Sequence, residues 1–169
     1  MRILGIDPGY ATVGYGIVDV GGYNFSVVGY GAVTTEPDLS FPQRLKLIYD
    51  DIITLIDKYH PDELSIERLY FNTNTTTAID VAQARGVIVM AAYSKGLNIS
   101  EYTPLQVKQA VTGYGKAEKR QVMEMVKNLL SLKSVPKPDD TADALALAVC
   151  HGHYAGSGVS KILREVEKK

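Results

Sequence analysis

The chain has 169 residues, of which 46% are apolar, with a single cysteine and a formal net charge of −1. This length suits one domain with a real hydrophobic core and is short for two. One cysteine excludes an internal disulfide and a cysteine-built metal site, and no apolar run reaches the roughly 18 to 20 residues of a membrane span. These features predict a soluble, cytoplasmic domain over residues 1–155, followed by a polar tail over residues 156–169.

Charge is unevenly distributed along the chain. Residues 1–70 carry 5 Lys and Arg against 10 Asp and Glu, whereas residues 71–137 carry 9 against 4. Such blocks usually form solvated faces. An acidic region beside a basic one is also what a nuclease needs, because carboxylates hold metal ions while Lys and Arg hold the phosphate backbone.

The first predicted element is a buried strand, Ile3 to Ile6, which ends at Asp7 and turns away at Pro8-Gly9. An ionised carboxylate at the end of a buried strand is costly unless it is paired, hydrogen-bonded or bound to metal. Asp7 can also simply cap the turn that follows. The choice between these interpretations depends on whether other carboxylates arrive beside it.

Two strands and a helix follow. Residues 12–20 and 25–34 are rich in Val, Tyr and Gly and are separated by Gly21-Gly22, a pattern typical of an antiparallel meander. From Pro42 to Tyr59, apolar residues recur at three- and four-residue steps, which predicts an amphipathic helix of about four turns. The alternating run 63–67 then predicts a strand parallel to the first, because a β-α-β passage connects parallel strands.

A helix is predicted over residues 78–93, after a polar loop at residues 72–77 that offers several caps. Its second half is apolar on nearly every side, so both faces need to be covered. The sheet covers one face. A second subunit is expected on the other, with Gly86, Val87 and Met90 at the interface.

The remaining elements complete an α/β fold with a mixed five-stranded sheet flanked by helices. The basic turn Gly113-Tyr114-Gly115-Lys116 joins two of the helices. The predicted elements are a strand at 98–102 and helices at 105–111, at 118–130 and from 144 to about 154.

Carboxylates from three of these elements are predicted to converge. Glu67 ends a strand beside that of Asp7, and Asp140 and Asp143 are three residues apart at a helix start, so they project from one face. Simple N-capping is the alternative, although Asp143 lies among core-like residues. Four carboxylates would repel one another and raise their pKa values unless divalent cations lay between them. Hard oxygen ligands suit Mg²⁺, and two such ions can clamp an in-line phosphoryl displacement.

The histidines and the cysteine are assigned no catalytic role. His151 and His153 are two residues apart and point away from each other on a helix, and His60 lies alone. All three are predicted at the surface or at helix ends. Cys150 is predicted to be a packed core thiol.

Five motifs closely resemble, in order and spacing, those of the bacterial Holliday-junction resolvase RuvC family. They are Asp7-Pro8-Gly9, Ile66-Glu67-Arg68, Gln83-Ala84-Arg85-Gly86, Val107-Lys108-Gln109 and Asp140-Thr141-Ala142-Asp143-Ala144-Leu145-Ala146. The likeness runs from Met1 to about His153. It implies a ribonuclease-H-like fold, a homodimer, and paired Mg²⁺-dependent nicks that resolve four-way DNA junctions during recombination and repair. It also suggests the branch-migration complex RuvAB as a partner.

Carried over residue by residue, the family's catalytic, metal-binding acids fall on Asp7, Glu67, Asp140 and Asp143. The resemblance implies two Mg²⁺ ions per active site, with Mn²⁺ as a possible substitute.

The family's DNA-contacting lysines fall on Lys108 and Lys119, and Lys116 lies near them in the basic turn. The family's aromatic beside the junction, usually Phe, falls on Tyr70, with Phe71 next to it. One of these rings is predicted to stack on an unpaired base. The alternative is that both rings pack beneath the polar loop.

Other functions are open to the same pattern. A related ribonuclease-H-like nuclease could act on another structured nucleic acid. Asp7-Pro8-Gly9, with Thr12 and Gly14, also resembles the first phosphate loop of actin-like ATPases and sugar kinases, but these need a second lobe for which the chain is too short. A catalytically inactive binding module would be expected to have lost part of the acidic set, which is complete here.

Overall fold

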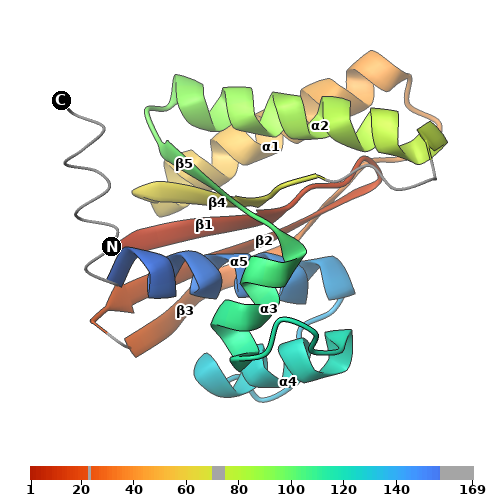
Figure 1. The fold of residues 1–169 in the computed structure, drawn as a ribbon. Coiled ribbons are helices and arrows are strands. Elements are labelled where there is room, and N and C mark those ends of the chain that lie inside the picture. The colour runs from red at the N-terminus through yellow and green to blue at the C-terminus, as the bar shows by residue number, and fades with distance from the viewer. Residues whose placement is uncertain (23, 70–74, 157–169) are drawn as a thin grey trace, which may run out of the picture.

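The computed structural model of the chain describes residues 1–22, 24–69 and 75–156. A central sheet lies between two layers of helices (Figure 1). The elements in chain order are β1 (Arg2–Asp7), β2 (Thr12–Gly21), β3 (Asn24–Thr34), α1 (Phe41–Tyr59), β4 (Glu63–Glu67), α2 (Thr75–Ser94), β5 (Asn98–Tyr102), α3 (Pro104–Thr112), α4 (Lys119–Leu129) and α5 (Asp139–Gly156).

The sheet has the order β3-β2-β1-β4-β5. β1, β2 and β3 pair antiparallel, whereas β1, β4 and β5 run parallel. This mixed five-stranded sheet confirms the predicted fold class. Ile6 lies opposite Ile66 in the parallel pair, so the residues that follow them, Asp7 and Glu67, come to the same edge of the sheet.

Each face of the sheet buries its own apolar core. On one face α1 and α2 cover the sheet, and α5 lies against the other face with α3 and α4 below it (Figure 1). α2 contributes Ala84 and Ile88, both with 0% exposure, to the first core. Its opposite side leaves Met90 and Tyr93 exposed, at 59% and 70%.

α5 lies directly on the backbone of β1 and β2. A Cβ atom at Gly5 would collide with the carbonyl oxygen of Ala144, and one at Gly14 would collide with that of Asp140. Glycine is required at these positions because it alone permits such close approach of helix and strand. The contact places the first turns of α5 over the end of β1.

Two helices begin three or more residues earlier than the sequence predicts. α2 begins at Thr75 and α5 at Asp139, because their first turns are polar and lack the apolar periodicity on which the prediction depends. None of the helices in the described part of the chain is long and apolar enough to cross a membrane.

Candidate active site

Three acidic side chains from separate elements line one cleft of about 260 Å³. Asp7 comes from the end of β1, Glu67 from the end of β4 and Asp143 from the second turn of α5. The walls come from α3 and α4, which contribute Lys108 and Lys119. The structure thus brings three of the four predicted acids and two of the predicted DNA-contacting lysines into one cleft.

The carboxylates act on one another's protonation. Burial raises the pKa of Asp7 to about 8, and the charges of Asp143, Glu67 and Asp140 add to the rise, while Lys119 opposes it. Burial and the charge of Asp143 also raise the pKa of Glu67, against a hydrogen bond from Asp7 that lowers it. Protonated Asp7 can therefore donate to the Glu67 carboxylate. An acidic cluster that holds a proton at neutral pH is a place where positive charge is favoured.

Lys119 supplies one positive charge to this cluster. Its Nζ lies 2.8 Å from Oδ2 of Asp143 and 3.8 Å from Oδ2 of Asp139. Burial alone would lower the pKa of Lys119, but the hydrogen bond and charge of Asp143 raise it above the ordinary value. The Lys119 side chain is 55% exposed, so it can also turn to a phosphate outside the cleft.

Asp140 approaches the cluster from a different side. It does not line the cleft but borders an adjoining hollow between the β1–β2 turn and the start of α2, together with Tyr10 and Asp80. Its charge still raises the pKa of Asp7. The fourth predicted acid therefore lies near the other three without sharing their cleft.

The donor set fits a hard divalent cation. Within residues 1–22, 24–69 and 75–156, no three His, Cys, Asp or Glu side chains lie close enough to hold one ion as they stand. Carboxylate oxygens are nevertheless the ligands that Mg²⁺ and Mn²⁺ take. The raised pKa of Asp7 arises in part from repulsion that a bound cation would relieve.

The other predicted site residues have varied positions. Lys116 is exposed in the turn before α4, and Tyr70 and Phe71 lie outside the described residues. Gly86 is exposed on α2, and a Cβ atom there would meet nothing within 4 Å. Val87, by contrast, is partly buried and packs against the core beneath α1 and α2.

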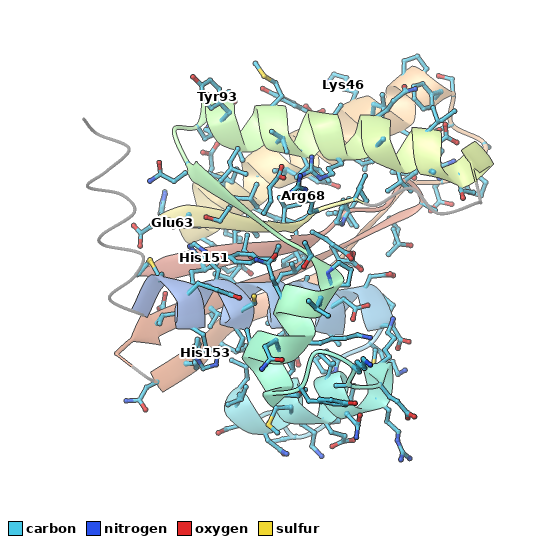
Figure 2. The ribbon with its side chains drawn as sticks, in the orientation of Figure 1. Lys46, Glu63, Arg68, Tyr93, His151 and His153 are labelled. Carbon is cyan, nitrogen blue, oxygen red and sulfur yellow. The ribbon has the colours of Figure 1, made fainter. Side chains whose placement is uncertain are left out.

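The prediction for His151 is wrong, because its side chain is buried with only 2% of the residue exposed. Its Nε2 lies 2.6 Å from Oε2 of Glu63, and the two side chains meet between β4 and α5 (Figure 2). Its Nδ1 lies 2.7 Å from the hydroxyl oxygen of Tyr102. Both ring nitrogens of His151 are therefore hydrogen-bonded to buried side chains.

Cys150 and the other two histidines lie closer to their predicted positions. Cys150 is buried, as predicted, and burial raises the pKa of its thiol to about 12. His60 ends α1 in a left-handed conformation with φ 48°. His153 is partly buried, with its ring edge-on to Phe25 at a centroid distance of 4.8 Å.

Comparison with known proteins points to one family. A family model described as crossover junction endodeoxyribonuclease RuvC matches residues 3–151. The chain is 60% identical to a protein of that name from Alkaliphilus metalliredigens, over 90% of this chain and 93% of the other. It is 52% identical to one from Clostridioides difficile, over 100% of this chain and 99% of the other.

A solved structure has the same fold. The structure of T. thermophilus RuvC in complex with a Holliday junction substrate matches with a TM-score of 0.86 and 32% identity, over 94% of this chain and 97% of that one. The likeness therefore extends over nearly the whole chain.

Proposed function

Because this chain belongs to the RuvC family of crossover junction endodeoxyribonucleases, we propose that it resolves four-way DNA junctions by hydrolysing phosphodiester bonds at the crossover. The observation that carries the proposal is the cleft in which Asp7, Glu67 and Asp143 face Lys108 and Lys119. We assign the nuclease to residues 1–155 and treat residues 156–169 as a tail. Recombination and repair are the processes in which such junctions are resolved.

The acids are the proposed holders of divalent metal. Asp7, Glu67, Asp140 and Asp143 would bind two Mg²⁺ ions, or Mn²⁺ in their place. When bound, such ions supply Lewis-acid activation of the attacking water and of the scissile phosphate. In the hydrolysis the water oxygen joins phosphorus and one ester P–O bond of the backbone breaks.

The basic residues are the proposed DNA contacts. Lys108 lines the cleft from α3, Lys119 reaches it from α4, and Lys116 lies between them in the chain. Lysines at these places would bind phosphates flanking the cut and would position the DNA without reading its sequence. Tyr70 or Phe71, which follow Glu67 by a few residues, would stack on a base left unpaired at the crossover.

A second copy of the chain is the proposed partner of α2. Ile79, Gly86, Met90 and Tyr93 recur on one exposed side of this helix, and Figure 2 shows Tyr93 pointing away from the sheet. Apolar side chains of this size along an exposed helix face indicate an interaction surface. An isologous pairing through this face would present two equivalent sites to the two strands that are cut. An interaction with the branch-migration complex RuvAB stays a prediction from the family resemblance.

The proposal is tested by cleavage of matched substrates with and without Mg²⁺. A four-way junction, a linear duplex of the same sequence and an RNA–DNA hybrid are incubated with the full chain. Symmetric cuts in the junction alone, only with the metal ion, are expected. Equal cutting of the hybrid or the duplex would instead support the ribonuclease-H-like alternative. No cutting of any substrate would contradict a nuclease.

The dimer is tested separately by sedimentation. Met90→Glu places a charge in the middle of the exposed apolar side of α2 and should yield a monomer, whereas the wild-type chain sediments as a dimer at micromolar concentration. Lys95 is exposed and directly follows the last residue of α2. Lys95→Glu is therefore the control for an added negative charge. A wild-type monomer would contradict the proposed pairing.

A further inference from the structure

Arg85 connects α2 with the end of β4, across the sheet face opposite the cleft. Its Nε donates to the main-chain carbonyl oxygen of Glu67 at 3.0 Å. Its Nη2 pairs with Oε1 of Glu101, on β5, at 2.5 Å. The Arg85 side chain is only 18% exposed. One guanidinium therefore joins a helix and two neighbouring strands.

The position of the carbonyl gives this contact its significance. Glu67 is the last residue of β4 and is still in register with Tyr102 of β5, but the pairing of β4 with β1 ends one residue earlier, at Ile66. A main-chain carbonyl beyond a strand ladder needs another donor. Arg85 supplies it, while the amide of Arg68 is held by the carbonyl oxygen of Tyr102. The backbone from which the Glu67 carboxylate projects is thus fixed on both sides.

The neighbours of Arg85 on α2 keep the guanidinium in place. Ala84 is fully buried and Gly86 is exposed, so Arg85 lies at the edge between the core and the surface. A shallow hollow around it is lined by Arg68, Leu69 and Glu101. Because two of its donors are used inside the protein, Arg85 is poorly placed to serve as a phosphate contact.

We propose that Arg85 is a positioning residue for the metal site: it holds the Glu67 main chain so that the carboxylate points into the cleft at the angle that a divalent ion requires. This inference rests on the proposed role of Glu67 as a metal ligand. Groups that orient a metal ligand without touching the ion affect metal affinity or activity by roughly 10- to 100-fold when removed.

The experiment compares variants of the full chain by two readouts. Mn²⁺ binding without DNA is measured by electron paramagnetic resonance, and junction affinity without metal is measured by fluorescence anisotropy. Arg85→Met keeps the apolar stem but removes every donor, so we expect Mn²⁺ affinity to fall roughly tenfold with junction affinity unchanged. Arg85→Lys keeps the charge but lacks the planar fork, so its Mn²⁺ affinity should lie between those of Arg85→Met and wild type.

Two further variants make the result specific. Lys95→Met removes an ion pair from the end of α2, that with Asp57 at 2.6 Å, without touching β4, and should bind Mn²⁺ as wild type does. Glu67→Gln should bind Mn²⁺ more weakly than either Arg85 variant. If Glu67→Gln bound Mn²⁺ normally, the proposed role of Glu67 would fail.

The inference about Arg85 fails in a different way. Normal Mn²⁺ affinity in Arg85→Met, beside a weakened Glu67→Gln, would overturn it. So would a loss of junction affinity with Mn²⁺ affinity intact, because Arg85 would then be a DNA contact. If Arg85→Met does not fold, as judged by circular dichroism, Arg85→Lys decides the matter by the same two readouts.

Discussion

α5 carries two groups of polar side chains that differ in how their charges are balanced. Near its C-terminal end, His151 contacts Glu63 and Tyr102, and each polar atom of the ring has a partner. In its second turn, Asp143 faces Asp7 and Glu67 across the cleft, and burial together with the charge of Asp143 raises the pKa values of both. The same helix therefore contributes to a balanced network, around His151, and to an unbalanced cluster, around Asp143.

The difference in pairing distinguishes a group of side chains that stabilises the fold from one that serves a function. A buried network whose members are all paired fixes the seating of a helix and is retained for that reason. A cluster of like charges lowers stability and is retained only where something gains from it, such as a bound cation or a substrate phosphate. In this chain Lys108 and Lys119 lie beside the acidic cluster, an arrangement that suits a phosphate bound next to a cation.

The largest effect is expected from neutralising the acids. Asp7→Asn, Glu67→Gln, Asp140→Asn and Asp143→Asn should each lower the rate of junction cleavage by about a thousandfold or more, because several kcal/mol of transition-state stabilisation are lost. Junction affinity should change little, since phosphate contacts supply most of it. Asp51→Asn is a matched control, because burial also raises the pKa of Asp51 but it lies on α1, away from the cleft. An acid variant that cut at the wild-type rate would lose its proposed role.

The balanced network should affect stability instead. His151→Ala removes a buried partner of the Glu63 carboxylate and should lower the free energy of unfolding by about 3 to 5 kcal/mol. His153→Ala, on the same helix but partly exposed, should cost much less. Urea denaturation measures both. At a temperature where His151→Ala is folded, its cleavage of junctions should match wild type. A loss of cleavage in the folded variant would place His151 in the active site.

The two groups also differ in how far the sequence predicts them. β4 and β5 have the predicted bounds, because alternation and the prolines at 61 and 104 delimit them. The meeting of Asp7 with Glu67 follows from the β-α-β passage that makes their strands parallel. Chain topology therefore suffices to predict this part of the acidic cluster.

The balanced network could not be predicted in this way. Glu63 and His151 are 88 residues apart, and an alternating strand offers no sign that its first polar residue faces inward. The place of Asp140 depends on how closely α5 approaches Gly14, which no pattern in the sequence expresses. Arg85 lies inside a recognised motif, but its contact with a main-chain carbonyl requires the folded backbone.

A smaller effect is expected on the stability of the metal-free protein. The folded-state pKa of Asp7 is raised from 3.8 to about 8, so between these pH values the unfolded chain releases a proton that the folded chain keeps. Stability therefore falls as pH rises through this window. Asp7→Asn removes the titration and should raise the free energy of unfolding at pH 8. The full pKa difference would correspond to about 1.4 kcal/mol per unit, but Lys119 and solvent screen part of the repulsion, so we expect a gain of about 2 kcal/mol.

Thermal unfolding in EDTA measures this change. Added Mg²⁺ should stabilise wild type and reverse the order, since the ion binds the folded state only. Asp19→Asn should instead lower the free energy of unfolding. The Arg2 hydrogen bond lowers the pKa of Asp19, and the substitution removes this favourable pair. If Asp7→Asn were less stable than wild type in EDTA at pH 8, the buried charge of Asp7 would not destabilise the fold.

The smallest effect concerns Lys119, which has two possible partners. Its ammonium pairs with Asp143 at 2.8 Å, yet its half-exposed position allows it to bind a phosphate. Lys119→Ala should weaken junction binding a few-fold and reduce the slope of log affinity against log salt by about one. Lys46→Ala is the control, because Lys46 lies on α1 in the opposite layer and pairs with Asp50 (Figure 2).

The salt slope distinguishes the two partners of Lys119. A phosphate contact releases a counterion, so its loss changes the slope, whereas loss of a counter-charge to Asp143 leaves the slope unchanged. In the second case the acids would repel more strongly and divalent ions would bind more tightly. An unchanged slope together with tighter Mn²⁺ binding would therefore assign Lys119 to the acidic cluster alone, and the DNA contacts would be left to Lys108 and Lys116.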